Sequence, residues 1–400
     1  MGRAMPCVTG PLAPFADGFG QWLAERGYAC ESARKQMLLM AHVSRWLSAH
    51  GLEVAGLTGT AVERFLAARR KAGYRRYVSL RAKAPLLGYL RAIGVAPSAS
   101  SVAVSPLEML LGWYSGYLAS ERGLAPGSVA GYVRAARVFL RERVGNGEVD
   151  LAGLAAAEVA EFVLSQCRDG TAEYAKRVTS RLRSLLRFLF VEGFTDTDLA
   201  SAVAPVAGRR PESLPKAVGR SEVARLLGSC DRRTGVGRRD FAILTMLSRL
   251  GLRAGEVAQL RLRDIDWRAG EMVVRGKGNT LARLPLPVDV GEAIVGWLRQ
   301  GRLRCDCPYV FTRVRAPITG LSTAGVSMAV ATACRRAGLP AFHAHRLRHT
   351  AATELLRAGA GLAEVGQVLR HRSQHTTSLY AKIDQRALAV VVQSWPGGVA

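Results

Sequence analysis

The sequence is short of acidic residues. Aspartate and glutamate account for 31 of its 400 residues, against 56 lysines and arginines, which gives a net charge of +25. Such an excess favours a polyanionic partner, with nucleic acid first and a membrane surface second. An arginine-rich composition from a GC-rich genome would explain the same charge without a partner.

Long hydrophobic runs and regularly spaced cysteines are also missing. The longest apolar runs, such as residues 387–392, are too short to cross a bilayer, and the N-terminus lacks the features of a signal peptide. The seven cysteines have no framework spacing, which predicts reduced thiols in a cytoplasmic protein. Cys305 and Cys307 form a close pair, but no second pair lies nearby in sequence, so we expect no metal site.

A helical pattern fills the first half of the chain. Residues 1–14 are expected to be disordered, and apolar residues then recur at three- and four-residue spacings over 15–95 and again over 106–203. The segment LLGYLRAIG at 86–94 is matched by LLRFLFVEG at 185–193. This repetition predicts duplication of one helical unit, although two unrelated amphipathic units would look the same.

The pattern changes in the second half. Residues 204–220 contain three prolines and paired arginines and are expected to be a basic linker. Over 214–396 we expect a helix capped by Ser221, an apolar helix ended by Gly251, and two strands around a glycine-rich turn, with further helices over 288–303 and 324–337. The predicted fold is therefore multidomain: two all-α helical domains followed by a mixed α+β domain.

The stretch 343–380 contains five of the seven histidines. His345 and Arg348 are three residues apart, so on a helix they share one face and can point at the same anion. A guanidinium group matches phosphate oxygens and stays charged at any working pH. Tyr380, nine residues beyond His371, would have its phenolate form favoured beside such cations. The pattern indicates a phosphate clamp with a nucleophile.

Each candidate residue has a simpler explanation when it is taken alone. Arg253 fits a salt bridge with Glu256, Lys277 fits a solvated turn, and Tyr380 fits a half-buried aromatic residue. The histidines at 343, 345 and 349 suggest a metal, but no nearby carboxylate completes a usual ligand set. What makes the combination specific is the order and spacing of its members.

These segments resemble the tyrosine recombinase, or phage integrase, family. The resemblance lies in HRLRHT (345–350), in LRHRSQHTTSLY (369–380), in LSRLGLRAGEVAQLRLRDID (247–266), which is similar to the family's first arginine box, and in the turn GKGN (276–279). One position departs from the family pattern, because Arg370 stands where glycine is usual. Glycine there would allow a left-handed backbone that arginine resists.

The resemblance implies a catalytic set with Glu256 as a supporting carboxylate that would hold His345 in place. Two arginines would hold a DNA phosphate in the transition state, and the tyrosine would form a covalent 3′-phosphotyrosyl intermediate. Because that intermediate retains the bond energy, no cofactor or metal is expected. The implied catalytic residues are Arg253, Lys277, His345, Arg348, His371 and Tyr380.

The resulting interpretation is a site-specific DNA recombinase serving integration, excision or transposition of a mobile element. It would act on paired sites in double-stranded DNA as a homotetramer, with accessory proteins, in the cytoplasm at the nucleoid. Each helical unit resembles the family's core-binding domain. Since one such domain is usual, the copy at 15–95 has an open role as an arm-site reader, a second DNA clamp or a protein-contact module.

Two alternatives remain open. A type IB topoisomerase would share the chemistry without needing a specific pair of sites. A catalytically idle DNA-binding regulator would result if Arg370 distorted the backbone around His371.

Overall fold

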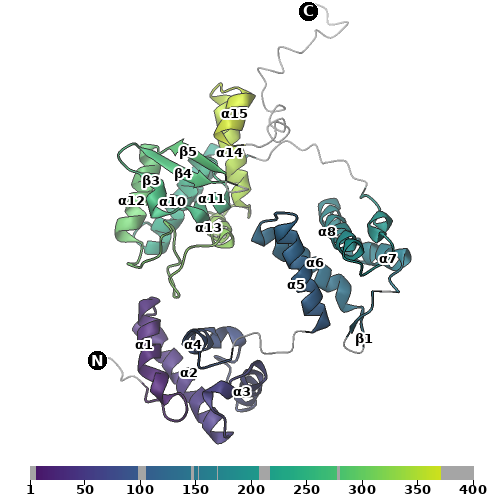
Figure 1. Cartoon of the computed structure of the whole chain (residues 1–400). Helices are drawn as coiled ribbons and strands as arrows, with labels where there is room; N and C mark the ends of the chain where they lie inside the picture. The colour runs from purple at the N-terminus through teal and green to yellow at the C-terminus, as the bar shows by residue number, and fades with distance from the viewer. Residues whose placement is uncertain are drawn as a thin grey trace, which may run out of the picture. The chain divides into compact units, whose positions relative to one another are not determined.

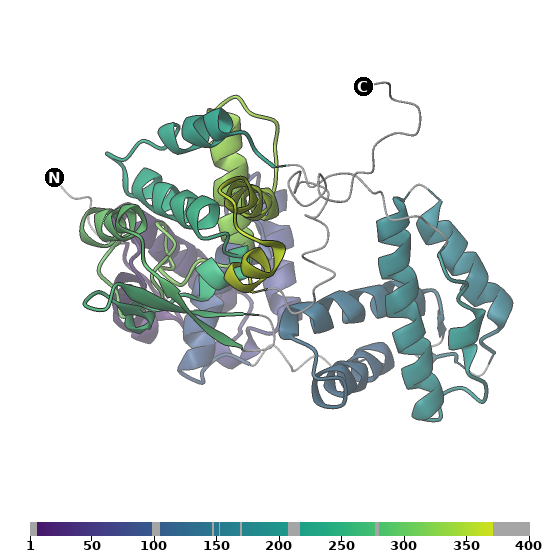
Figure 2. The ribbon, with the colours of Figure 1, turned by 90° about the horizontal axis from the view of Figure 1, so that it is seen from above.

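The computed structural model describes residues 6–97, 105–145, 148–151, 153–168, 170–206, 217–276 and 280–370 (Figures 1 and 2). It is rich in helices and has a small sheet, which confirms the predicted fold class. By density of contacts the chain divides into two compact units. One consists chiefly of residues after 211 and the other chiefly of 41–211, with pieces of the first 40 residues in each. No helix in the described ranges has the length and apolar character needed to cross a membrane.

The first helical region follows the predicted periodicity. Thr58 caps its third α-helix by accepting a hydrogen bond from the backbone N–H of Ala61 at 3.3 Å. Gly27 and Gly94 follow its first and fourth α-helices with positive φ angles of 74° and 75°, the usual way for a helix to end. The elements are η1 (Ala13–Phe15), α1 (Ala16–Glu25), α2 (Cys30–Ala49), η2 (Val54–Gly56), α3 (Gly59–Lys71) and α4 (Leu80–Ala92).

The second helical region packs around aromatic residues. Tyr114 is fully buried, and its ring centroid lies 5.0 Å from that of Phe188. Gly123 and Gly193 have positive φ at positions that correspond to the two glycines of the first region. This correspondence supports a duplication, which stays a prediction together with the domain boundaries. The elements are α5 (Pro106–Ser120), α6 (Pro126–Arg141), β1 (Val144–Gly145), β2 (Glu148–Val149), α7 (Ala156–Cys167), α8 (Ala172–Val191) and η3 (Leu199–Ala202).

The third region is built around the buried helix α10, which packs against α12 and α14. Trp297 of α12 is fully buried, and its indole N–H donates to the carbonyl oxygen of Val310 at 2.8 Å. The helices are α9 (Arg220–Gly228), α10 (Gly235–Arg249), α11 (Ala254–Gln259), η4 (Leu262–Asp264), α12 (Val288–Gln300), α13 (Thr323–Arg336), α14 (Ala344–Arg357) and α15 (Leu362–Val368).

The sheet of this region has three antiparallel strands in the order β3 (Ile265–Asp266), β4 (Glu271–Arg275) and β5 (Leu281–Pro285). The predicted strand pair is present, with Arg275 opposite Leu281, whereas β3 was not predicted. The Arg275 guanidinium binds both carboxylate oxygens of Asp264, one of them at 2.8 Å. This ion pair fixes the end of β4 beside the turn of Lys277, a residue outside the described ranges.

One predicted helix cap is wrong. Helix α9 begins at Arg220 with Gly219 as its N-cap residue. Ser221 is therefore the second residue inside the helix and not its cap. The backbone N–H of Gly219 donates to the Glu222 carboxylate at 2.8 Å. The Glu222 side chain thus accepts from the N-cap N–H, which is one half of a capping box, and the half that a serine hydroxyl would supply is absent because the N-cap residue is glycine.

The first region buries two cations close to each other. Lys83 and Arg69 are 2% and 8% exposed. In the described part of the chain, neither Lys83 Nζ nor Arg69 Nε has a hydrogen-bond partner. Burial, with Arg69 and Arg70 nearby, lowers the pKa of Lys83 to about 8. Its ammonium lies 4.3 Å from the centre of the Phe65 ring, which offsets only part of the lost hydration.

Lys83→Met should raise the free energy of unfolding. Burying an unpaired charge is unfavourable, so an apolar side chain of similar length should stabilise the chain at pH 7 by about 1–3 kcal/mol. Because the folded-state pKa of Lys83 lies below the unfolded value, wild-type stability should recover as the pH rises from about 8 towards 10.5. Urea unfolding of both proteins at pH 7 and pH 10 measures this. An advantage of the variant that persists undiminished at pH 10 would contradict the charge explanation.

Candidate active site

Two helices of the third region present the described candidate residues. Arg253 is the N-cap residue of α11, directly after the Gly251 turn, while His345 and Arg348 lie in α14 as predicted. The turn requires glycine, because Gly251 has a φ of 57° and an added Cβ would lie 2.6 Å from the Leu369 side chain. The sequence thus places an arginine immediately beyond a tight turn that packs against the end of α15.

Arg348 is 1% exposed and joins three segments of the chain. Its Nη1 donates to the carbonyl oxygen of Gly251 at 2.7 Å, and its Nη2 donates to that of Leu369. The first carbonyl belongs to the turn before Arg253, and the second belongs to Leu369, the C-cap residue of α15. A guanidinium group has five donors in a fixed plane, so these two bonds fix its orientation.

Arg253 is held by the buried carboxylate of Glu256, which is 2% exposed. The backbone N–H of Arg253 donates to Glu256 Oε2 at 2.8 Å, and Arg253 Nη1 donates to Oε1 at 2.8 Å. Arg253 Nη2 also lies 3.5 Å from the carbonyl oxygen of Arg370. Arg348 and Arg253 therefore bind the consecutive carbonyls of residues 369 and 370, so the two guanidinium groups converge at the end of α15.

Arg370 is a second partner of Glu256 that the sequence did not reveal. Its Nη2 donates to Glu256 Oε2 at 2.9 Å, and its side chain is 14% exposed. Burial lowers the pKa of its guanidinium, an effect that the carboxylate opposes. Its backbone has a φ of 56°, the left-handed conformation for which glycine was expected. The recorded partners of Glu256 are thus two arginines and not His345, which corrects the predicted support for the imidazole.

His345 and His349 face each other one turn apart on α14. Their ring centroids are 4.3 Å apart with the planes at 71°. Partial burial, followed by Arg348 and Arg253, lowers the pKa of His345. Burial, and after it His345 and Arg348, lower the pKa of His349 to about 4. Both rings are consequently neutral at pH 7, and a neutral imidazole offers one donor and one acceptor nitrogen.

The described residues bring together four of the seven predicted site residues. Arg253, Glu256, His345 and Arg348 meet around the end of α15, as the contacts above show, whereas Lys277, His371 and Tyr380 lie outside the described ranges. Across those ranges, no three histidine, cysteine or acidic side chains gather so as to hold a metal ion. Two guanidinium groups beside a neutral imidazole can bind an oxyanion and accept or donate one proton.

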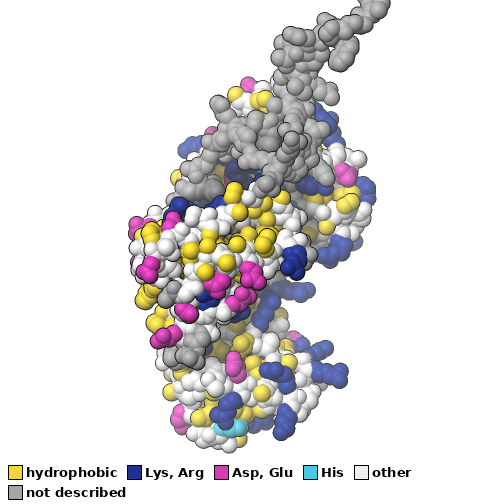
Figure 3. All heavy atoms as spheres, turned by 90° about the vertical axis from the view of Figure 1, so that its right-hand side faces the viewer, with side chains coloured by type: hydrophobic (Ala, Val, Ile, Leu, Met, Phe, Trp, Pro, Cys, Tyr) yellow, Lys and Arg dark blue, Asp and Glu magenta, His cyan; other side chains and the backbone are white. Residues whose placement is uncertain are grey.

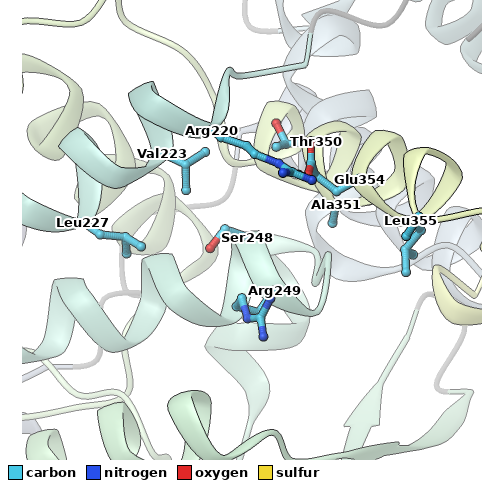
Figure 4. Close-up of a pocket in the computed structure, with 10 residues that line it drawn as sticks. Arg220, Val223, Leu227, Ser248, Arg249, Thr350, Ala351, Glu354 and Leu355 are labelled. Carbon is cyan, nitrogen blue, oxygen red and sulfur yellow. The ribbon is translucent and has the colours of Figure 1, made fainter.

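A separate cavity of about 480 Å³ lies between α9, α10 and α14 (Figure 4). Apolar side chains including Val223, Leu227 and Leu355 line it, and the side chains of Arg220 and Glu354 form an ion pair at its edge. None of the predicted catalytic residues contributes to its lining. We therefore assign it no part in the chemistry.

Arg370→Gly and Arg370→Ala should differ in stability although both remove the same guanidinium group. Alanine retains the strain of a left-handed backbone and glycine does not, so the alanine variant should be less stable by about 1 kcal/mol. Thermal or urea unfolding of the two proteins measures the difference. In a protein that already carries Glu256→Gln, both substitutions of Arg370 should destabilise less than they do in wild type, because the ion pair between the two residues is already lost. Equal stability of the two variants would mean that the backbone at position 370 is unstrained.

Comparison with known proteins agrees with this site. Residues 216–386 match the model of the phage integrase family. The chain is 40% identical to the putative integrase/recombinase y4rA of Sinorhizobium fredii over 97% of its own length and 95% of that protein. It is 32% identical to the tyrosine recombinase XerD of Mycobacterium tuberculosis over 73% of its own length and 97% of that protein.

Solved structures share the fold. A lambda integrase dimer bound to a core site superimposes with a TM-score of 0.52 at 19% identity, covering 68% of this chain and 94% of that one. The XerH site-specific recombinase in a post-cleavage complex gives a TM-score of 0.52 at 19% identity, covering 72% and 97%. With relatives matched over nearly their whole length and a site of two converging arginines, the chain belongs to the tyrosine recombinase family.

Proposed function

We propose that the protein is a site-specific DNA recombinase that cuts and rejoins strands through a covalent 3′-phosphotyrosyl intermediate. The observation that carries this proposal is the convergence of Arg253 and Arg348 on the carbonyls of residues 369 and 370, beside His345. Two fixed guanidinium groups at one point provide the charge that a phosphodiester needs as its non-bridging oxygens become more negative.

The described residues have distinct roles in this proposal. Arg253 and Arg348 hold the scissile phosphate from two sides, and Glu256 fixes the direction of Arg253. His345, neutral at pH 7 because its pKa is lowered, accepts the proton of the attacking hydroxyl or donates to the phosphate. The guanidinium groups keep their charge throughout, so among these described residues only the imidazole can take up or give up a proton.

Three further roles rest on residues outside the described ranges. Tyr380 attacks the phosphorus and forms the covalent bond while the 5′ oxygen of the next nucleotide leaves. Lys277 protonates that oxygen, since an ammonium group near two arginines gives up its proton more readily. His371, which follows Arg370 directly in the sequence, donates to a phosphate oxygen.

The proposed substrate is double-stranded DNA with a pair of recombination sites, and the proposed assembly on it is a homotetramer. A lambda integrase tetramer bound to a Holliday junction has a fold similar to this chain, with a TM-score of 0.50 at 19% identity. The place of action would be the nucleoid in the cytoplasm, with accessory proteins directing the outcome. Integration, excision and transposition share the same strand chemistry.

The two alternatives have separate tests. A type IB topoisomerase would relax a supercoiled plasmid that lacks any recombination site. An idle regulator would bind DNA and form no covalent adduct on a nicked suicide substrate. The ion pair of Arg370 with Glu256 argues against the second alternative, because the arginine holds the left-handed turn in place instead of disrupting it.

Tyr380→Phe should keep its affinity for DNA and lose strand cleavage. The substitution removes only the nucleophilic oxygen, so we expect binding within about twofold of wild type, which corresponds to less than 0.5 kcal/mol. Denaturing gel electrophoresis after incubation with a suicide substrate detects the covalent adduct, and anisotropy measures binding. Arg348→Met serves as a comparison that should lose both adduct and stability, because it removes buried hydrogen bonds. A phenylalanine variant that still forms the adduct would reassign the nucleophile.

Removing the residues after Asp384 should weaken assembly on DNA. The apolar segment 387–392 lies outside the described residues, and we propose that it docks on a neighbouring protomer, since head-to-tail contacts of this kind close rings. Sedimentation of the truncated chain on a two-site DNA should show smaller complexes than wild type, while both chains remain monomers without DNA. Unchanged assembly would remove the tail from the interface.

A further inference from the structure

The positive charge of the two helical regions is concentrated in one segment. Residues 59–92, from α3 to α4, contain nine basic residues and one acidic residue, whereas residues 15–58 contain four of each. The second region, residues 106–203, contains 11 basic and 12 acidic residues. All of the net charge of the two regions therefore lies on α3, α4 and the turn that joins them.

Most of these cations are exposed and form a basic patch, which we define as Arg70, Lys71, Arg75, Arg76 and Arg81. Figure 3 shows Lys and Arg side chains gathered on the lower part of the molecule, which holds α1 to α4. Within the described chain no member of the patch has a carboxylate within 4.0 Å. By contrast, three basic residues outside the patch have carboxylate partners: Arg26, Arg34 and Lys35.

Aromatic side chains connect the helices and the turn that carry the patch. The Arg69 guanidinium lies 4.0 Å from the centre of the Tyr74 ring, and the His42 ring lies 5.7 Å from the same ring. The Lys83 ammonium lies over the Phe65 ring. These contacts connect α2 and α3 to the turn that carries Arg75 and Arg76, and α4 to α3.

The buried cations of this region lower the stability of the protein when no partner is bound. Arg69 and Lys83 are buried in the same region, with Arg70 of the patch near Lys83, and in the described part of the chain neither has a carboxylate partner. Like charges at this density repel one another and lower stability. A polyanion lying on the patch would reverse that effect, because it supplies the negative charge that the protein lacks here.

We propose that this patch binds the phosphate backbone of duplex DNA next to the segment held by the rest of the protein. Arginine and lysine contacts to phosphate position a protein on DNA without reading its sequence. The first helical region would thus add affinity through release of counterions, and base recognition would come from elsewhere. The choice of DNA over another polyanion rests on the proposed function, which already brings a duplex to the chain.

Two full-length variants that remove the same charge test the proposal. One is Lys71→Gln/Arg75→Gln/Arg76→Gln, within the patch. The control is Arg26→Gln/Arg34→Gln/Lys35→Gln, in the neutral half of the same region. Anisotropy with a duplex extending well beyond one recombination site, measured from 0.05 to 0.3 M salt, gives the dissociation constant and its salt dependence.

The patch variant should bind DNA roughly tenfold or more weakly at 0.1 M salt. The slope of log K against log salt should fall in magnitude by about two to three, which is the expectation for losing three phosphate contacts. The control should stay close to wild type in both quantities. Both variants should form the covalent adduct at saturating protein, because neither change touches the active site.

Equal slopes for the patch variant and the control would overturn the proposal. So would a patch variant that binds DNA normally but no longer binds vesicles containing phosphatidylserine, a result that would assign the patch to a membrane surface. Loss of the adduct in wild-type protein would instead disprove the proposed chemistry and leave the binding result standing. Circular dichroism and thermal unfolding of all three proteins establish that the variants are folded.

Discussion

The active region depends on the two hydrogen bonds of the buried Arg348 guanidinium. They join α14 to the Gly251 turn and to the end of α15. Arg348 and Gly251 are 97 residues apart in the sequence. The Leu369 carbonyl belongs to the C-cap residue of α15, which has no partner within the helix, and the Gly251 carbonyl belongs to the turn after α10. Arg348 is 1% exposed, and a buried charge is costly unless it is hydrogen-bonded, so these acceptors are what allow the guanidinium to lie inside the fold.

Glu256 extends this arrangement to the other arginines. It is buried and receives hydrogen bonds from Arg253 and Arg370, so a single carboxylate balances two guanidinium groups. The strained backbone at Arg370, with φ of 56°, costs about 1 kcal/mol. A charge-assisted hydrogen bond to a buried carboxylate contributes about 1.5–3 kcal/mol. The side chain therefore compensates for the backbone conformation that its own Cβ disfavours.

The sequence predicted what depends on local spacing. The helix that carries His345 and Arg348, the strand pair around Lys277 and the salt bridge of Arg253 with Glu256 all follow from periodicity or from residues three apart. The carbonyl partners of Arg348 did not, because main-chain acceptors have no signature in a side-chain pattern. The pairing of Arg370 with Glu256 spans 114 residues. Its only trace in the sequence was an arginine where the family has glycine.

The net charge of the sequence also could not be assigned to a particular region before the structure was known. A net charge of +25 indicated a polyanionic partner but did not identify the part of the chain that binds it. The two helical regions correspond in helix order and in their helix-ending glycines, yet one carries the excess of cations and the other is nearly neutral. Lys83 and Arg69 are buried in the first region, and in the described part of the chain neither has a carboxylate partner, so their charges lower its stability. The proposed DNA contact of the first region would supply the negative charge that these cations lack.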